Sequence, residues 1–316
     1  MGITSGGDSE YEASTPSREE KTVKIQEEIK NQLANNPTGL TLSGKYYDDE
    51  DAEIIAGLDV LQTVRALDLK DNQISDRGLK LLMESPRLSG LEELYLDVNF
   101  ISDEGLLAIL QSEAVTVKSL KKLSMQDNRL TDASIKELVR SPHFNCLEYL
   151  DAGWNEIGND TAKALAEADA LPALKFLELE RGYIEKEGIE PFLQGSLVER
   201  LEELNLSANK LNDDAALLIA EAPKLGNLKV LRLSQNLIGD PGAKAIGTST
   251  TLKGLTHLYM GRNMFGPEGA KAVHETSTLA NLKTLFLQEG VEITPGIVNY
   301  SRPELLRPED PSLAGE

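Results

Sequence analysis

The sequence contains very few of the residues on which metal binding, disulfide formation and covalent catalysis depend. Its single cysteine, Cys146, allows no disulfide within the chain, and we expect a small buried thiol there, at the entrance of a strand. The three histidines, at positions 143, 257 and 274, are too scattered for a metal site. A catalytic thiol needs a nearby base in an electropositive setting, for which His143 alone is weak support. We therefore expect no catalytic residues, no metal and no cofactor.

Long apolar runs and runs of basic residues are missing as well. No stretch approaches the roughly 20 apolar residues of a membrane span, and residues 1–8 have neither the basic start nor the apolar run of a signal peptide. A net charge of -20, from 52 acidic and 32 basic residues, repels phosphate backbones. We expect a cytoplasmic monomer that binds neither membranes nor nucleic acid. The charge either serves solubility alone or favours a protein partner with a basic surface.

What the chain has in abundance is one motif, Leu-x-x-Leu-x-Leu-x-x-Asn. One copy runs from Leu91 to Asn99 and another from Leu228 to Asn236. Successive copies are 27 residues apart except for one step of 29, and such a fixed period is typical of a solenoid of stacked units. The nine copies begin at Val64, Leu91, Leu120, Leu147, Leu174, Leu201, Leu228, Leu255 and Leu282.

Within each copy the apolar period changes from 2 to 3.6, which predicts a short strand, a turn and then a helix. The closing Asn falls at the turn, where its amide can satisfy backbone groups. At the helix start an Asp or Ser, as in Ser75-Asp76, is expected to cap the free amides. Gly182 replaces the Asn once within the array, which predicts an altered turn, and Gly290 replaces it at the end. The Asn positions are Asn72, Asn99, Asn128, Asn155, Asn209, Asn236 and Asn263.

The ends of the chain depart from the repeat. Residues 1–16 are polar and are expected to be a disordered tail. Residues 17–63 are expected to form an N-terminal cap, with a helix that starts in a capping box at Ser17 and a degenerate first strand around Leu40. Nine repeats of about 27 residues then fill residues 64–290, with two extra residues in a return loop near 115–117. Residues 291–316 are expected to form a C-terminal cap and tail.

The 27-residue period and the phrase that follows the Asn carry a family resemblance. Ile74-Ser75-Asp76-Arg77-Gly78-Leu79 and Ile238-Gly239-Asp240-Pro241-Gly242-Ala243 are two examples of this phrase. Over roughly residues 40–290 the chain resembles the ribonuclease-inhibitor-like class of leucine-rich repeat proteins. This resemblance implies an α/β solenoid in the shape of a horseshoe, with a parallel β-sheet on the concave face and helices on the convex face. It implies no single function, because inhibitors, the Ran GTPase-activating protein and sensing domains of immune receptors share the class.

Candidate binding residues are those that the strands do not commit to the core, since scaffold positions that face outward usually carry binding. Aromatic and acidic side chains gather on the strands of the first half, and aromatic and basic ones near the end. Trp, Tyr and Arg are preferred interface anchors, but aromatics also suit a pleated sheet surface, and Trp154 could equally pack at its turn. The candidates are Tyr95, Asp97, Tyr149, Asp151, Trp154, Phe176, Glu178, Glu180, Arg232, His257, Tyr259, Arg262 and Phe286.

These features together predict a protein–protein interaction scaffold that holds a partner on its concave sheet face. Side chains fixed on a sheet lose little entropy on binding, which suits such a role. Two alternatives remain open. One is a GTPase-activating or regulatory protein resembling the Ran GTPase-activating protein, which rests on fold analogy alone. The other is a secreted bacterial effector, or a recognition subunit, that uses the repeats to bind a host protein.

Overall fold

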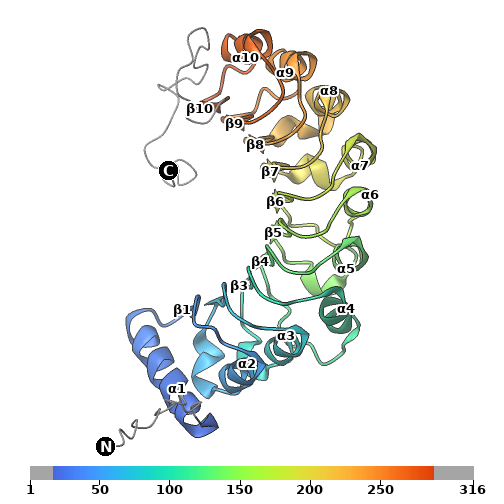
Figure 1. The fold of residues 1–316 in the computed structure, drawn as a ribbon. Coiled ribbons are helices and arrows are strands. Elements are labelled where there is room, and N and C mark those ends of the chain that lie inside the picture. The colour runs from blue at the N-terminus through green and yellow to red at the C-terminus, as the bar shows by residue number, and fades with distance from the viewer. Residues whose placement is uncertain (1–16, 288–316) are drawn as a thin grey trace, which may run out of the picture.

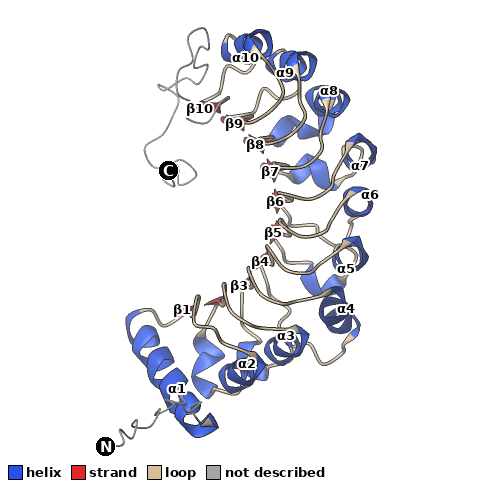
Figure 2. Ribbon diagram, viewed as in Figure 1, coloured by secondary structure: helices blue, strands red, loops and turns tan. Residues whose placement is uncertain are grey.

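The computed structural model describes residues 17–287 and shows a curved array of strand–helix units (Figure 1). Ten strands form one sheet in the order in which they follow in the chain, and every neighbouring pair is parallel. The strands lie along the inner side of the arc and the helices along its outer side (Figure 2). The predicted horseshoe, with its sheet concave and its helices convex, is confirmed.

The elements are short and regular. The strands are Gly39–Thr41 (β1), Ala66–Asp68 (β2), Glu93–Tyr95 (β3), Lys122–Ser124 (β4), Tyr149–Asp151 (β5), Phe176–Glu178 (β6), Glu203–Asn205 (β7), Val230–Arg232 (β8), His257–Tyr259 (β9) and Thr284–Phe286 (β10). The helices are Arg18–Asn35 (α1), Asp49–Ala56 (α2), Asp76–Met83 (α3), Asp103–Gln111 (α4), Asp132–Leu138 (α5), Asn159–Ala166 (α6), Lys186–Phe192 (α7), Asp213–Glu221 (α8), Asp240–Gly247 (α9) and Pro267–His274 (α10). Short 3-10 helices are Asp59–Thr63, Pro86–Leu88, Pro142–Phe144, Leu197–Arg200 and Pro223–Asn227.

The sheet register reproduces the repeat length of the sequence. Leu40 of β1 pairs with Leu67 of β2, so the degenerate first strand belongs to the sheet as predicted. Glu93 pairs with Lys122, which is the 29-residue step. The extra residues lie between α4 and β4, where the side chains of Val115 and Val117 are buried. The predicted return loop is therefore confirmed, and it leaves the register of the strands intact.

The turn Asn side chains connect each repeat to the one before it. Asn99 is buried, and its Nδ2 donates to the carbonyl oxygens of Leu96 at 3.1 Å and of Leu69, one repeat earlier, at 3.0 Å. Its Oδ1 accepts from the amide of Ile74 at 3.0 Å. Buried backbone groups need such partners. The ladder thus holds each turn in the same geometry, including the left-handed residue that precedes each Asn.

Where a helix starts with Asp, as α3 does, this Asp acts between repeats rather than within its own helix. Ser75 caps its own helix by accepting from the amide of Arg77 at 3.4 Å. The carboxylate of Asp76 instead accepts from the amide and the hydroxyl of Ser102 in the next repeat, at 2.7 and 2.6 Å. The first amides of a helix have no partner within it. The expectation that an Asp or Ser caps the free amides at the helix start is confirmed for Ser75, whereas Asp76 bonds to the next repeat.

Helix α1 covers the open edge of the sheet at β1. The predicted capping box is confirmed, with the Ser17 hydroxyl accepting from Glu20 and the Glu20 carboxylate accepting from Ser17. The side-chain amide of Gln32 occupies both backbone groups of Thr41 in β1, at 2.9 and 2.7 Å. An unpaired strand edge invites association with other chains, and this helix blocks it.

The turn at Gly182 differs from the prediction. Arg181, which precedes it, has φ 53°, within the 50–55° of its equivalents in the other repeats, so the backbone is not altered there. Backbone hydrogen bonds to the preceding repeat hold the turn, as the amide of Tyr183 donates to the carbonyl oxygen of Ile157 at 2.7 Å. The predicted tails, residues 1–16 and 291–316, and Gly290 lie outside the described residues. Within residues 17–287, the helices are all too short or too polar to cross a membrane.

Candidate functional site

The concave face displays the side chains that alternate with the buried leucines of the strands. In β5, for example, Leu150 enters the core while Tyr149 and Asp151 face the arc, because successive side chains of a strand point to opposite sides. We call this surface the inner face. Most of the predicted residues lie on it, namely Tyr95, Tyr149, Asp151, Phe176, Glu178, Arg232, His257, Tyr259 and Phe286 on strands, with Asp97 and Glu180 just beyond strand ends.

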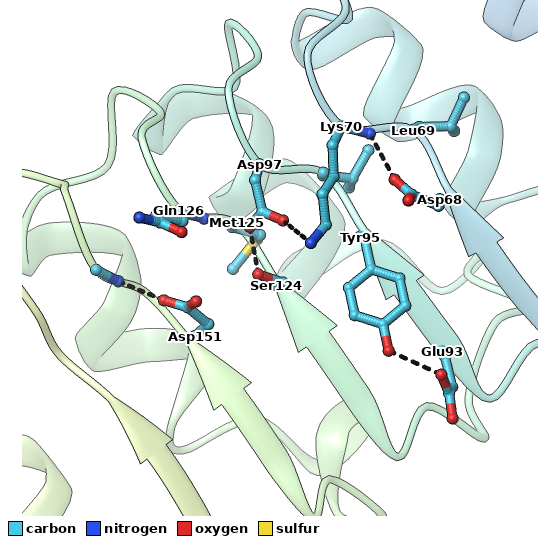
Figure 3. Close-up of polar contacts among 12 residues, drawn as sticks. Asp68, Leu69, Lys70, Glu93, Tyr95, Asp97, Ser124, Met125, Gln126 and Asp151 are labelled. Carbon is cyan, nitrogen blue, oxygen red and sulfur yellow. Dashed lines mark hydrogen bonds and ion pairs between the residues drawn. The ribbon is translucent and has the colours of Figure 1, made fainter. Parts of the chain in front are cut away.

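Asp97 is already engaged by its own neighbours, which the sequence did not reveal. Figure 3 shows Lys70 reaching its carboxylate, with 3.1 Å between Lys70 Nζ and Asp97 Oδ2, and Ser124 donating to Oδ1. The amide of Gln126 also donates to Oδ1, at 2.9 Å. Asp97 is only 5% exposed. Its charge therefore ties three consecutive repeats together at the end of the strands.

Asp151 and Glu178 form the acidic middle of the inner face. They are register partners on β5 and β6, so their carboxylates extend from neighbouring strands. Burial raises the pKa of Asp151 to about 6, and the charge of Asp97 adds to this against the Gly153 amide, which donates at 2.9 Å. Burial likewise raises the pKa of Glu178 to about 7, opposed by the positive charge of Arg232. Both carboxyl groups thus change charge near neutral pH.

Aromatic rings flank this acidic middle. Tyr149 precedes Asp151 on the same strand by two residues, and its hydroxyl lies 3.4 Å from Asp151 Oδ2. Burial raises the pKa of the Tyr149 phenol, and the charges of Asp151 and Glu178 raise it further, so the hydroxyl stays a donor. Phe176 pairs in register with Tyr149 on β6. A cation placed here would meet carboxylates and ring faces together, the combination that favours Lys and Arg side chains.

The aromatic and basic residues near the end of the sheet are less exposed than predicted. Arg232 lies 3.7 Å from a carboxylate oxygen of Glu178 and 3.4 Å from one of Glu203, and its guanidinium is 5.2 Å from the ring centre of Tyr259. Tyr259 is only 7% exposed, so the expectation of an exposed anchor is wrong there. The Arg232 guanidinium lies near the ring, and its ion pairs with Glu178 and Glu203 hold it there.

Trp154 and Arg262 lie off the inner face. Each occupies the left-handed position just before the turn Asn, with φ 54° and 53°, beyond the end of its strand. We call this edge the rim and define it as the positions immediately before and after each turn Asn or Gly182. The rim residues are Asp71, Gln73, Val98, Phe100, Asp127, Arg129, Trp154, Glu156, Arg181, Tyr183, Ala208, Lys210, Gln235, Leu237, Arg262 and Met264.

Sequence reasoning missed most of the rim. It carries exposed apolar side chains that were not candidates, among them Phe100, Tyr183, Leu237 and Met264. Several lie beneath cations of the next repeat, as Phe100 does with the guanidinium of Arg129 4.9 Å from its ring centre. One feature of the sequence marks this row: the residue after each turn Asn is followed at most repeats by a buried Ile or Leu, so its position recurs in every copy. The strand periodicity stops at the turn, so it could not identify this row.

The remaining sequence-based expectations concern Cys146 and metal binding. Cys146 is exposed rather than buried as expected, while Phe144 and Leu147 on either side of it enter the core. Its thiol lies 3.3 Å from the Asn145 side-chain oxygen. Among the described residues, His, Cys, Asp and Glu side chains form no group of three or more that could hold a metal ion.

Known proteins resemble this chain in both repeat pattern and sequence. The family model described as "Leucine Rich repeat" matches residues 60–83 and 226–247. The ribonuclease inhibitor of Mus musculus is 28% identical over 196 residues, and that of Sus scrofa is 30% identical over 198 residues. This chain is a leucine-rich repeat protein of the ribonuclease-inhibitor-like class. Each of these matches covers 51% of the leucine-rich repeat chain and 43% of the inhibitor, so the chain spans less than half the length of these relatives.

Two further similarities extend the comparison. NACHT, LRR and PYD domains-containing protein 12 of Mus musculus is 29% identical over 216 residues, which is 57% of this leucine-rich repeat chain and 20% of that protein. The crystal structure of a TDR receptor matches 86% of this chain and 45% of its own, at 17% identity and a TM-score of 0.44.

Proposed function

We propose that this leucine-rich repeat chain is a protein-binding scaffold whose inner face receives a basic segment of a partner protein. The observation that carries this is the acidic middle of the inner face, where Asp151 and Glu178 sit among Tyr149 and Phe176. Within residues 17–287, Asp151 has no ion pair with a cation, and Glu178 shares Arg232 with Glu203. The similarity to ribonuclease inhibitors, which are named as inhibitors of another protein, supports a binding role.

The mechanism is rigid preorganisation. The parallel strands and the Asn ladder fix the inner-face side chains before a partner arrives, so little conformational entropy is lost on binding. A Lys or Arg side chain of the partner would supply the positive charge that the half-buried carboxylates need as a partner. Charge-assisted hydrogen bonds in such a setting are worth roughly 1.5–3 kcal/mol each. An acidic face also accelerates encounter with a basic partner at low salt.

The test is a titration with fluorescently labelled poly-lysine as the probe. The variant Asp151→Asn/Glu178→Gln removes both charges while keeping the side-chain shapes. Its matched control is Glu104→Gln/Glu187→Gln, which removes two exposed charges from α4 and α7 on the convex side. We expect the inner-face variant to bind the probe about tenfold more weakly than the wild type. Equal weakening by both variants would show that only net charge matters and would overturn the proposal.

The GTPase-activating and effector alternatives differ in partner rather than in scaffold. No residue among those that the structure describes favours either alternative, so a choice between them depends on identifying the partner. Recovery of a small GTPase on the wild-type chain, with its loss from Asp151→Asn/Glu178→Gln, would assign the regulatory role to this same face.

A further inference from the structure

The rim is basic and apolar along one half of the molecule. From Arg181 to Met264 its positions are Arg181, Tyr183, Ala208, Lys210, Gln235, Leu237, Arg262 and Met264, and none of these described residues is acidic. The earlier half carries three acidic residues in the same rows, Asp71, Asp127 and Glu156. In a chain with 52 acidic and 32 basic residues, an acid-free row is against the average composition. We call this half the basic rim.

The basic rim exposes large apolar side chains at repeating positions. Tyr183 is 55% exposed, Leu237 is 52% and Met264 is 71%, and all three directly follow the turn Asn or Gly182 of their repeat. Single exposed apolar residues are ordinary. Recurrence at one position of several stacked repeats instead places them along one edge, which is how a solenoid builds an extended binding strip. Strand spacing of about 4.8 Å gives the strip a length of about 15 Å, which is four to five extended residues.

Two cations of the basic rim, Arg181 and Lys210, are held against aromatic rings. The guanidinium of Arg181 lies 4.0 Å from the ring centre of Trp154, and Lys210 Nζ lies 5.1 Å from that of Tyr183. Lys210 also pairs with Glu185 at 3.8 Å, between side chains that are both about half exposed, which is a weak interaction. For Arg181, no carboxylate of the described residues lies within ion-pair distance. A guanidinium stacked on an indole keeps its N–H edges free for a carboxylate.

We propose that the basic rim is a second docking surface, separate from the inner face, for an acidic segment of a partner that also carries apolar side chains. Carboxylates of the segment would bind Arg181 and Lys210, and its apolar side chains would cover Tyr183, Leu237 and Met264. Charge complementarity identifies this occupant, because the inner face of the same chain is acidic and would repel it. The segment would lie along the edge of the arc, across successive repeats.

The test uses the random copolymer of glutamate and tyrosine as the probe, with polyglutamate as a probe that has charge but no rings. Trp154 is the sole tryptophan of the chain and lies against Arg181, so selective excitation of indole reports directly on the rim. We expect the copolymer to shift the Trp154 emission and to bind more tightly than polyglutamate. The variant Arg181→Gln/Lys210→Gln should bind the copolymer about tenfold more weakly.

Two control variants separate the rim from net charge and from the inner face. Lys163→Gln/Lys271→Gln removes two exposed cations from α6 and α10 on the convex side and should bind the copolymer like the wild type. Asp151→Asn/Glu178→Gln should not weaken binding of the copolymer, although it weakens binding of poly-lysine. A further variant tests the apolar part of the rim: Leu237→Ser/Met264→Ser should abolish the preference for copolymer over polyglutamate.

Several results would overturn the assignment. Failure of the wild-type chain to bind the copolymer would show that the rim is no acidic-segment site. Equal losses in the rim and convex lysine variants would reduce the effect to overall charge. Displacement of the copolymer by inorganic phosphate at an equal concentration of anionic groups would point to a phosphorylated ligand instead. Each outcome leaves the poly-lysine test of the inner face unaffected.

Discussion

The inner face and the basic rim lie on the same repeats but differ in the sign of their charge and in how far it is buried. On the inner face, acidic groups are half-buried, and Asp97 is neutralised by Lys70 at 3.1 Å while Asp151 has no cation partner among residues 17–287. On the rim, cations such as Arg181 rest on exposed rings. A solenoid can separate the two because strand positions and turn positions face different directions. One chain thereby offers an acidic and a basic surface.

The largest effect is expected where both surfaces depend on the same frame, the Asn ladder. Asn209 is buried, donates to the carbonyl oxygens of Leu179 and Leu206 at 2.8 and 3.2 Å, and accepts from the Ile184 amide at 3.0 Å. Replacing it by Ala leaves these groups without partners, so we expect Asn209→Ala to lower the free energy of unfolding by about 2–4 kcal/mol. Urea denaturation followed by circular dichroism measures this.

A matched control for the ladder is Asn227→Ala. The side-chain amide of Asn227 donates an exposed hydrogen bond to the Glu199 carbonyl oxygen at 2.8 Å. Loss of this bond should lower the free energy of unfolding by less than about 1 kcal/mol. Similar losses in both variants would mean that the ladder is not what holds the turns. The Gly182 turn, which keeps its geometry without an Asn, makes this a necessary comparison.

The next effect concerns pH and acts on the inner face alone. The pKa values of Asp151 and Glu178 are raised to about 6 and about 7, so the folded chain holds protons that the unfolded chain releases. The free energy of unfolding should therefore fall as pH rises from about 4 to about 7, by about 1–3 kcal/mol for each of these two groups. Asp151→Asn/Glu178→Gln should remove this part of the decline. The measurement is urea denaturation of both proteins at several pH values in that range. An equal pH dependence of the free energy of unfolding in the wild type and the variant would contradict the burial of these carboxyl groups.

The smallest effect is expected on the rim, where charge is exposed. Arg181→Gln removes the stack on Trp154, which is 37% exposed, and should lower the free energy of unfolding by less than about 1 kcal/mol. The same substitution is part of the variant that should weaken copolymer binding about tenfold. A large loss of stability would instead make Arg181 a structural residue, and the contrast between the two surfaces would fail.

Sequence reasoning reached the parts of the structure that repeat with a fixed period. The strand register, the return loop at 115–117 and the capping box at Ser17 followed from spacing and local chemistry. The inner-face positions followed from strand alternation. The burial of Tyr259 did not, because it involves Arg232 of the preceding strand, which only stacking brings next to the ring. The bond from Asp76 to Ser102 was missed for the same reason, since it joins residues that only stacking brings together.

The rim was missed because left-handed turn residues obey neither the strand nor the helix period. Trp154 was a candidate anchor, with packing at its turn as the alternative, but the other residues of this row were not considered together with it. Tyr183, Leu237 and Met264 look unremarkable one at a time, and only their alignment in the structure makes them a surface. Aligning the copies on the turn Asn rather than on the strand leucines would have shown this row.

The most direct test of the central claim is capture of a partner from native lysate on three immobilised proteins, followed by mass spectrometry. These are the wild type, the inner-face variant Asp151→Asn/Glu178→Gln and the convex control Glu104→Gln/Glu187→Gln. A protein with a basic segment that is retained by the wild type and the control, and lost from the inner-face variant, is the predicted result. Equal retention by all three folded proteins would contradict the claim that the acidic middle of the inner face binds the partner.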